Sequence, residues 1–200
     1  MDKEQLRSQL SRAPIIEVTR AGLRQAAVLV PVYPDRSGLS VCFLRRPEAM
    51  RSHAGQIAFP GGGYEDQDGD LGQTALRETH EELGIEPTRV ELLGRIDETW
   101  TPSGYRMSPY VGWLQEPPEL RPNPREVSEV LQVEVAQLME PRLLRHEYWD
   151  HQGQSYRMVF FDIPGGPIWG ATARILYRFL QSGFDWRQDD DEPWERPHPS

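Results

Sequence analysis

The sequence predicts a single domain of the α/β or α+β class, in which helices flank a mixed sheet. A near-continuous apolar run over residues 25–33 has the length and composition of a buried strand. A short acidic helix pattern follows a glycine-rich segment, and an amphipathic pattern over residues 168–182 predicts a closing helix. With 200 residues, the chain is long enough to bury the core that such a domain needs.

The first predicted elements are a helix and a pair of strands. Residues 3–10 carry a polar helix pattern, and we expect residues 1–24 to form an N-terminal helical extension. The strand at residues 25–33 connects through the turn-forming residues 34–38 to a second strand at residues 39–45. The main domain therefore starts with two neighbouring strands.

The later elements alternate between strands and helices, and we assign residues 25–183 to the main domain. From residue 184 to residue 200 the chain is rich in Asp, Pro and Trp without periodicity, so we expect a disordered C-terminal tail. The patterns predict strands at residues 90–96, 107–114 and 156–163, a short helix at residues 133–139 and the closing helix at residues 168–182.

Composition excludes several classes of function. The formal net charge of −9 argues against general binding of nucleic acid or of anionic membranes. Cys42 is the only cysteine, which excludes an intramolecular disulfide and a thiolate metal cluster. The chain has no apolar run long enough to span a membrane and opens with a polar, charged segment, so we expect a cytoplasmic protein.

Three carboxylates share one stripe of the predicted acidic helix. Glu78, Glu81 and Glu82 stand at i, i+3 and i+4, a spacing at which like charges repel by roughly 0.2–0.5 kcal/mol per pair. A helix tolerates such a cluster more readily when a cation lies among the oxygens, and oxygen ligands favour Mg²⁺ or Mn²⁺ over Zn²⁺. A solvated acidic face is the alternative interpretation.

The helix follows a glycine loop, Phe59-Pro60-Gly61-Gly62-Gly63-Tyr64-Glu65. Consecutive glycines let the backbone pass close to a ligand or another strand, so we expect Gly61 and Gly62 to contribute to substrate binding. Asp70 has the position of an N-cap residue, and Gly84 reads as the helix stop. The unit is therefore strand, glycine loop, short acidic helix and stop.

This unit resembles the box of the Nudix hydrolases, Gly-x5-Glu-x7-Arg-Glu-h-x-Glu-Glu-x-Gly-h, where h is apolar. The stretch Arg77-Glu78-Thr79-His80-Glu81-Glu82-Leu83-Gly84-Ile85 matches the second half, with Thr79 as a soft departure. In the first half, strict counting from Arg77 puts Gly69 at the expected glutamate. Alternatively, one inserted residue lets an aspartate do that glutamate's work. We prefer the insertion, and the candidates are Asp66, Asp68 and Asp70.

A second segment resembles the motif of coenzyme A diphosphatases within this family, Leu-Leu-Thr-x-Arg-(Ser/Ala)-x3-Arg-x3-Gly-x3-Phe-Pro-Gly-Gly. The departures are Cys42-Phe43-Leu44 in place of Leu-Leu-Thr, and Pro47 where Ser or Ala is usual. The resemblance covers roughly residues 25–182. The residues that fall at the motif's spacing are Arg46, Arg51, Gly55, Phe59, Pro60, Gly61 and Gly62.

The resemblance implies a Nudix fold, an α/β/α sandwich with a central mixed sheet, and metal-assisted hydrolysis of a diphosphate. Glu78, Glu81 and Glu82 would be catalytic residues that hold Mg²⁺ or Mn²⁺. Arg77, expected to point about 100° away from that face, would tie the helix to the glycine loop. Glu126 is the candidate general base, and Glu98 competes with it. These assignments make residues 25–183 a Nudix hydrolase domain.

Arg46 and Arg51 are the expected contacts to the substrate phosphates, either the diphosphate or an adenosine 3′-phosphate, with structural ion pairing as the alternative. Three hypotheses follow for the function. The chain cleaves coenzyme A to 4′-phosphopantetheine and adenosine 3′,5′-bisphosphate, hydrolyses another nucleotide such as ADP-ribose, or is an inactive binding module. The three intact glutamates oppose the last, and the run from Arg51 to Gly62 favours coenzyme A. Whether two copies form a homodimer stays open.

Overall fold

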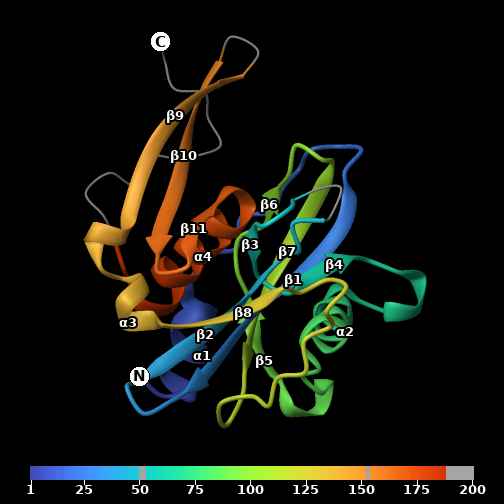
Figure 1. Ribbon diagram of the computed structural model, residues 1–200, viewed down its shortest axis with the longest axis vertical. Helices are drawn as coiled ribbons and strands as arrows, with labels where there is room; N and C mark the ends of the chain where they lie inside the picture. The colour runs from blue at the N-terminus through green and yellow to red at the C-terminus, as the bar shows by residue number, and fades with distance from the viewer. Residues whose placement is uncertain (50–52, 152–153, 188–200) are drawn as a thin grey trace.

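The computed structural model describes residues 1–49, 53–151 and 154–187, and strand β1 (Arg24–Pro34) runs through its centre (Figure 1). Every residue of β1 from 26 to 33 is buried. β1 pairs antiparallel with β2 (Leu39–Arg45) and parallel with β7 (Tyr105–Trp113), so the sheet is mixed, as predicted. A strand flanked on both edges and covered on both faces meets no water, which explains the unbroken apolar run.

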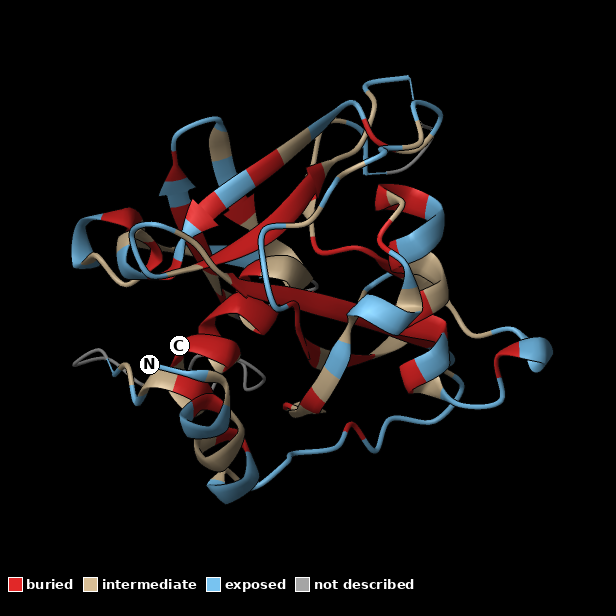
Figure 2. Ribbon diagram, turned by 90° about the horizontal axis from the view of Figure 1, so that it is seen from below, coloured by how far each residue is buried: buried red, intermediate tan, exposed pale blue. Residues whose placement is uncertain are grey.

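The remaining strands extend this sheet on both sides of β1. In the described part of the chain the sheet has eight strands, with the path β3-β2-β1-β7-β5 and three side pairings. Colouring by burial shows the strands as the buried centre of the molecule (Figure 2). The added strands are β3 (Ile57–Ala58) and β8 (Glu129–Glu134) beside β2, β4 (Gly61–Gly63) beside β1, and β5 (Glu91–Arg95) and β6 (Thr99–Trp100) beside β7.

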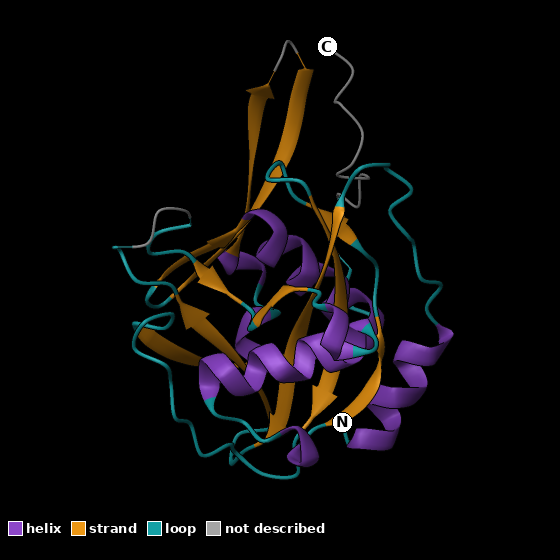
Figure 3. Ribbon diagram, turned by 90° about the vertical axis from the view of Figure 1, so that its right-hand side faces the viewer, coloured by secondary structure: helices purple, strands orange, loops and turns teal. Residues whose placement is uncertain are grey.

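Helices cover both faces of the sheet. Alternate residues of β1 point to opposite faces. Ala27 and Leu29 pack with residues of helix α2 (Leu71–Leu83), whereas Val28 and Val30 belong to the core that contains helix α4 (Gly170–Phe184). Helix α1 (Lys3–Arg12) packs against α4 and β5 through its buried leucines. Figure 3 shows α2 lying across the sheet. The layers are therefore helix, sheet and helix.

A second, three-stranded sheet adjoins this body, and two of its strands project from it as a long hairpin (Figure 1). It consists of β9 (Leu144–His151), β10 (Gln154–Ile163) and β11 (Gly166–Trp169), all antiparallel. Short helical turns join the larger elements, and no helix of the described residues is long and apolar enough to cross a membrane. These turns are η1 (Asp66–Asp68), η2 (Pro87–Arg89), α3 (Val135–Leu138) and η3 (Pro141–Leu143).

The structure corrects two helices expected from sequence. The helix predicted at residues 133–139 contains only Val135–Leu138, because residues 133 and 134 belong to strand β8, where pairing with β2 overrides the local pattern. The closing helix starts at Gly170 rather than at Ile168, which pairs with Phe161 in the second sheet. Backbone pairing with a distant strand decided both boundaries.

The end of the described chain packs against the core. Phe184 closes helix α4, and Trp186 lies with its ring centroid 5.4 Å from that of Tyr177 and 6.1 Å from that of Phe161. The Trp186 indole N–H donates to the Met139 carbonyl at 2.9 Å. Two residues that the sequence assigned to the tail therefore belong to the folded domain, and residues 188–200 lie outside the described residues.

Candidate active site

Helix α2 carries the acidic stripe and has the ends that its sequence predicts. The Asp70 side chain accepts a hydrogen bond from the Gln73 backbone N–H at 2.8 Å, which caps the N-terminus. Gly84 adopts φ of 71° and donates its N–H to the His80 carbonyl at 2.8 Å. An L-residue with a side chain resists this left-handed conformation, so the glycine sets the helix end.

The three glutamates of the stripe differ in exposure. The Glu82 side chain is 2% exposed, Glu78 is 15% exposed and Glu81 is 51% exposed. Glu82 accepts a hydrogen bond from the Gly61 backbone N–H at 2.9 Å. A Cβ atom on Gly62 would lie 2.4 Å from Glu78 Oε1, so a side chain at this position would displace the carboxylate. The glycine loop and the stripe thus form one contact surface.

Burial makes this surface an unfavourable place for negative charge. It raises the pKa of Glu82 to about 7, although the Gly61 N–H and the nearby Arg46 guanidinium partly offset the effect. Burial likewise raises the pKa of Glu78. The charge of Glu126 pushes both pKa values further upward, so Glu126 lies within electrostatic reach of both carboxylates. A cation among these oxygens would favour their ionised forms.

Glu126 reaches this position through a segment that is tied to the end of α2. The backbone N–H of Asn123 donates to the Glu82 carbonyl at 2.9 Å, and that of Glu126 donates to the Asn123 carbonyl at 3.0 Å. The Ser128 N–H then donates to the Arg45 carbonyl at 2.9 Å, at the end of β2. The chain therefore carries Glu126 across the C-terminal part of the acidic helix.

The competing carboxylate, Glu98, lies in a separate buried network. It accepts hydrogen bonds from the Ser108 hydroxyl at 2.6 Å and from the Val18 backbone N–H at 3.0 Å. Arg95 Nη1 lies 3.6 Å and Arg106 Nε 3.9 Å from its oxygens. These contacts link Glu98 to the N-terminal segment and to strands β5 and β7, and none involves the acidic stripe.

Arg77 ties the acidic helix to the glycine loop through Asp68. Its Nε donates to Asp68 Oδ1 at 2.6 Å, and its Nη2 donates to Asp68 Oδ2 and to the Gly63 carbonyl, both at 3.1 Å. This ion pair lowers the pKa of Asp68 to about 2. Of the three candidate aspartates, Asp68 is the one that receives the arginine, whereas Asp70 caps α2 and Asp66 is exposed.

Arg77 also reaches the stripe from which it was expected to point away. Its Nη1 lies 3.0 Å from Glu78 Oε1 and 3.2 Å from Glu81 Oε2. The Cα direction differs by about 100°, but the long side chain bends back toward the two anions. The guanidinium therefore bridges the loop, Asp68 and the exposed edge of the stripe.

The donor set suits a hard divalent cation. Among the described residues, no three His, Cys, Asp or Glu side chains already converge as a metal-binding group, and Arg77 lies between Glu78 and Glu81. The available donors are carboxylate oxygens, which Mg²⁺ and Mn²⁺ prefer. Two of them, on Glu78 and Glu82, are held at positions where burial penalises an uncompensated charge. These residues therefore fit a divalent cation chemically.

The structure describes one of the two arginines that were predicted to contact the substrate phosphates. Arg46 Nη2 lies 3.8 Å from Glu82 Oε1, which places this guanidinium at the acidic stripe. Its backbone closes a loop, because the Arg46 N–H donates to the Gln56 carbonyl at 3.0 Å and the Gly55 N–H donates to the Arg46 carbonyl at 3.1 Å. Arg51 lies outside the described residues.

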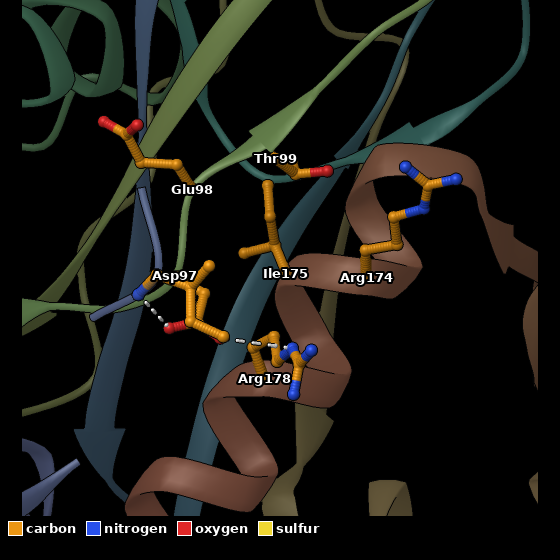
Figure 4. Close-up of a pocket in the computed structure, with 7 residues that line it drawn as sticks. Asp97, Glu98, Thr99, Arg174, Ile175 and Arg178 are labelled. Atoms are coloured by element: carbon orange, nitrogen blue, oxygen red, sulfur yellow. Dashed lines mark hydrogen bonds and ion pairs between the residues drawn. The ribbon is translucent and has the colours of Figure 1, made fainter. Parts of the chain in front are cut away.

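Two hollows differ in size and position. The one between α4 and the segment before β6 has a volume of about 30 Å³, which is enough for a single water molecule. In it Asp97 pairs with Arg178, and Arg174 and Thr99 line the far end (Figure 4). The second hollow, beside Gly63, has a volume of about 460 Å³. Only the second is large enough for part of a nucleotide.

Sequence reasoning could not choose among the three aspartates, and it did not find the hollow beside Gly63. Their spacing in the sequence fits Asp66, Asp68 and Asp70 equally well as the residue that replaces the first glutamate of the box. The η1 turn then places Asp68, and not the other two, beside Arg77. The hollow combines residues from the starts of β1 and β7 with the end of β4. Tyr105, an aromatic residue after the turn-forming residues 101–104, is a sequence feature that could have pointed to it.

Comparison with known proteins identifies the family. The model of the NUDIX domain matches residues 23–159. An uncharacterized Nudix hydrolase NudL from Photorhabdus laumondii is 36% identical over 160 residues, which cover 79% of this chain and 84% of that protein. A NudL from Shigella flexneri is 36% identical over 175 residues, with 86% and 85% covered. Nudix hydrolase 22 of Arabidopsis thaliana, a chloroplastic protein, is 34% identical over 177 residues, 85% of this chain but 57% of its own length.

Solved structures agree on the fold. A Nudix hydrolase from M. smegmatis, RenU, superposes with a TM-score of 0.50 at 23% identity, covering 62% of this chain and 80% of its own. A MutT/nudix family protein from Enterococcus faecalis gives 0.52 at 14% identity, covering 92% and 70%. The helix–sheet–helix layers, the mixed sheet and the box on α2 are thus those of the Nudix fold. Family model, relatives and fold agree that this chain belongs to the Nudix hydrolase family.

Proposed function

We propose that this Nudix hydrolase cleaves the diphosphate of coenzyme A or its derivatives to 4′-phosphopantetheine and adenosine 3′,5′-bisphosphate. The observation that carries the proposal is the position of Arg46. It stands at the spacing of the coenzyme A diphosphatase motif, and its guanidinium lies 3.8 Å from Glu82 at the acidic stripe. A guanidinium at that position can contact a diphosphate held against the stripe.

The residues of the stripe would hold the divalent cation. Glu78 and Glu82, with Glu81 at the exposed edge, are its candidate ligands, and Mg²⁺ or Mn²⁺ suits their oxygens. Such a cation neutralises phosphate charge and lowers the pKa of bound water. Arg77 would still be held by Asp68 and the Gly63 carbonyl beside such a cation, so it would position the helix against the loop.

Glu126 is our candidate for the general base. It lies close enough to raise the pKa of both Glu78 and Glu82, whereas Glu98 is engaged by Ser108 and Val18 in a separate network. Proton abstraction by a positioned carboxylate contributes roughly 10²–10⁴-fold to a rate. We therefore expect Glu126→Gln to lower kcat by that range with little change in KM. If Glu98→Gln lowered kcat as much as Glu126→Gln while keeping wild-type stability, the assignment of Glu126 over Glu98 as the general base would fail.

The experiment for the substrate compares purified protein on coenzyme A, dephospho-coenzyme A, ADP-ribose, NADH and diadenosine polyphosphates with Mg²⁺ or Mn²⁺. We expect coenzyme A to be preferred. Arg46→Ala should lower kcat/KM about ten- to a hundredfold, the effect of one charge-assisted contact. Because Arg46 lies at the stripe, coenzyme A and dephospho-coenzyme A should suffer alike. Arg36→Ala, in the exposed turn between β1 and β2, is the control.

Two outcomes would count against the proposal. Equal wild-type rates on coenzyme A and ADP-ribose would remove the coenzyme A assignment and leave a Nudix hydrolase of broader specificity. Hydrolysis of none of these substrates with either metal would favour an inactive binding module, although the three intact glutamates oppose that reading.

A further inference from the structure

The hollow beside Gly63 lies where three strands meet. Arg24 and Tyr105 are register partners at the starts of the parallel strands β1 and β7, and Gly63 ends β4 opposite Ala26. Together with Gln25 and Tyr64, these residues line a volume of about 460 Å³. Small-molecule sites occupy roughly 300–1,000 Å³, so the hollow can take a ligand fragment of nucleoside size.

The lining residues suit a planar, anionic group. The Arg24 guanidinium carbon lies 4.1 Å above the centroid of the Tyr105 ring, so the two planar groups form one platform. Tyr64 adds a second phenol and Gln25 adds an amide, and the lining contains no carboxylate. Aromatic rings and guanidinium planes stack on nucleobases, whereas a flexible, uncharged pantetheine arm gains little from either.

The hollow is connected to the acidic stripe through the glycine loop. The Gly63 carbonyl accepts from Arg77 Nη2 at 3.1 Å, and Nη1 of the same guanidinium lies 3.0 Å from Glu78 Oε1. The preceding residue, Gly62, is the one that faces the Glu78 carboxylate. A ligand in the hollow therefore lies one loop residue away from the proposed site of diphosphate cleavage.

We infer that this hollow binds the nucleoside end of the diphosphate substrate, with the base stacked on the Arg24–Tyr105 platform. The inference rests on the proposed function, because it assumes that the diphosphate lies between Arg46 and the glutamates. The inference gives the two arginines different roles in substrate binding. Arg46 contacts the diphosphate, and Arg24 contributes to binding of the nucleotide half alone.

The test measures binding of the two halves of coenzyme A separately, by calorimetry on the 200-residue chain with Mg²⁺. Tyr105→Leu and Arg24→Gln should each weaken binding of adenosine 3′,5′-bisphosphate by about tenfold, the loss of one stacking contact. Binding of 4′-phosphopantetheine should stay within about twofold of wild type. Tyr105→Phe keeps the ring and should bind the bisphosphate like the wild type.

The matched control is Arg145→Gln. Arg145 also lies over an aromatic ring, 4.3 Å from the Phe160 centroid, but on the projecting hairpin. It should leave both affinities unchanged. Urea unfolding of each variant checks that the fold is kept. If Tyr105→Leu is destabilised, the binding data for Arg24→Gln alone decide the test.

Three results would overturn the inference. They are unchanged binding of the bisphosphate in both variants, equal weakening for both halves, or selective weakening for 4′-phosphopantetheine. Failure of the proposed function is recognised separately, because the wild-type protein would then cleave ADP-ribose at least as fast as coenzyme A. In that case AMP and ribose 5-phosphate replace the two halves, and selective loss of AMP binding would still support the nucleoside site.

Discussion

Replacing Asp68 with Asn tests whether its ion pair with Arg77 holds the acidic helix to the glycine loop. The Asp68 side chain is 2% exposed and that of Arg77 is 19% exposed. Besides the two bonds from Arg77, Asp68 Oδ2 accepts from the Thr74 hydroxyl at 2.8 Å and from the Glu65 backbone N–H at 2.9 Å. Asn offers one acceptor oxygen in place of two and turns an N–H₂ group toward donors.

These contacts give two estimates of the unfolding free energy that Asp68→Asn should lose. Removing one partner of a buried, hydrogen-bonded ion pair costs roughly 3–5 kcal/mol. The pKa of Asp68 is lowered from 3.8 to about 2, mainly by its hydrogen bond from Arg77. That shift corresponds to roughly 2 kcal/mol of stability at neutral pH. We therefore expect Asp68→Asn to lower the free energy of unfolding by about 2–4 kcal/mol at pH 7.

The pH dependence has a definite sign. Because the folded-state pKa of Asp68 lies below the value of the unfolded chain, its contribution is fully present above about pH 4 and is lost as the pH falls toward 2. The difference in unfolding free energy between wild type and Asp68→Asn should therefore be constant from pH 7 to 5 and should shrink below pH 4. Urea unfolding followed by tryptophan fluorescence measures it.

The neighbouring aspartates provide matched controls. Asp66 is exposed, so Asp66→Asn should change stability by less than about 0.5 kcal/mol. Asp70 caps α2, and because Asn caps about as well as Asp, Asp70→Asn should also have a small effect. If Asp68→Asn costs no more than these two, or if its cost is the same at pH 7 and pH 3, the ion pair does not have the role we give it.

Three further predictions concern the stripe, the loop and the chain end. Glu82→Gln keeps the buried shape but removes an anionic ligand, so activity should fall by orders of magnitude without loss of stability in EDTA. Near-normal turnover would mean that Glu82 does not hold a catalytic cation. Gly62→Ala brings a Cβ to 2.4 Å from Glu78 and should lower kcat/KM by about 10²-fold. Gly94→Ala is the control, because its Cβ would meet its nearest neighbour at 3.7 Å. If both variants kept the same kcat/KM, the close approach of Gly62 to Glu78 would not matter for activity. Trp186 is partly buried against the core, so Trp186→Ala should lower the unfolding free energy by about 1–3 kcal/mol in urea titrations. No change would mean that Trp186 does not contribute to the folded domain.

The sequence by itself determined the features that depend on neighbouring residues. The i, i+3, i+4 spacing of Glu78, Glu81 and Glu82 follows from helix periodicity, and Asp70 and Gly84 mark the helix ends through local backbone preferences. The strand predicted at residues 39–45 is observed as Leu39–Arg45. The match of the box to a known family added the fold, which the periodicity alone left as α/β or α+β.

Only the tertiary structure decided which distant residues join the stripe. Asp68 rather than Asp66 or Asp70 receives Arg77, because the η1 turn directs it there. Glu126 rather than Glu98 lies near the glutamates, because the segment before β8 is hydrogen-bonded to the end of α2. Spacing along the chain constrains contacts within a helix turn. Asp68 and Arg77 are nine residues apart and meet across the η1 turn, whereas Glu126 reaches the glutamates through sheet register and loop closure, which local preferences do not encode.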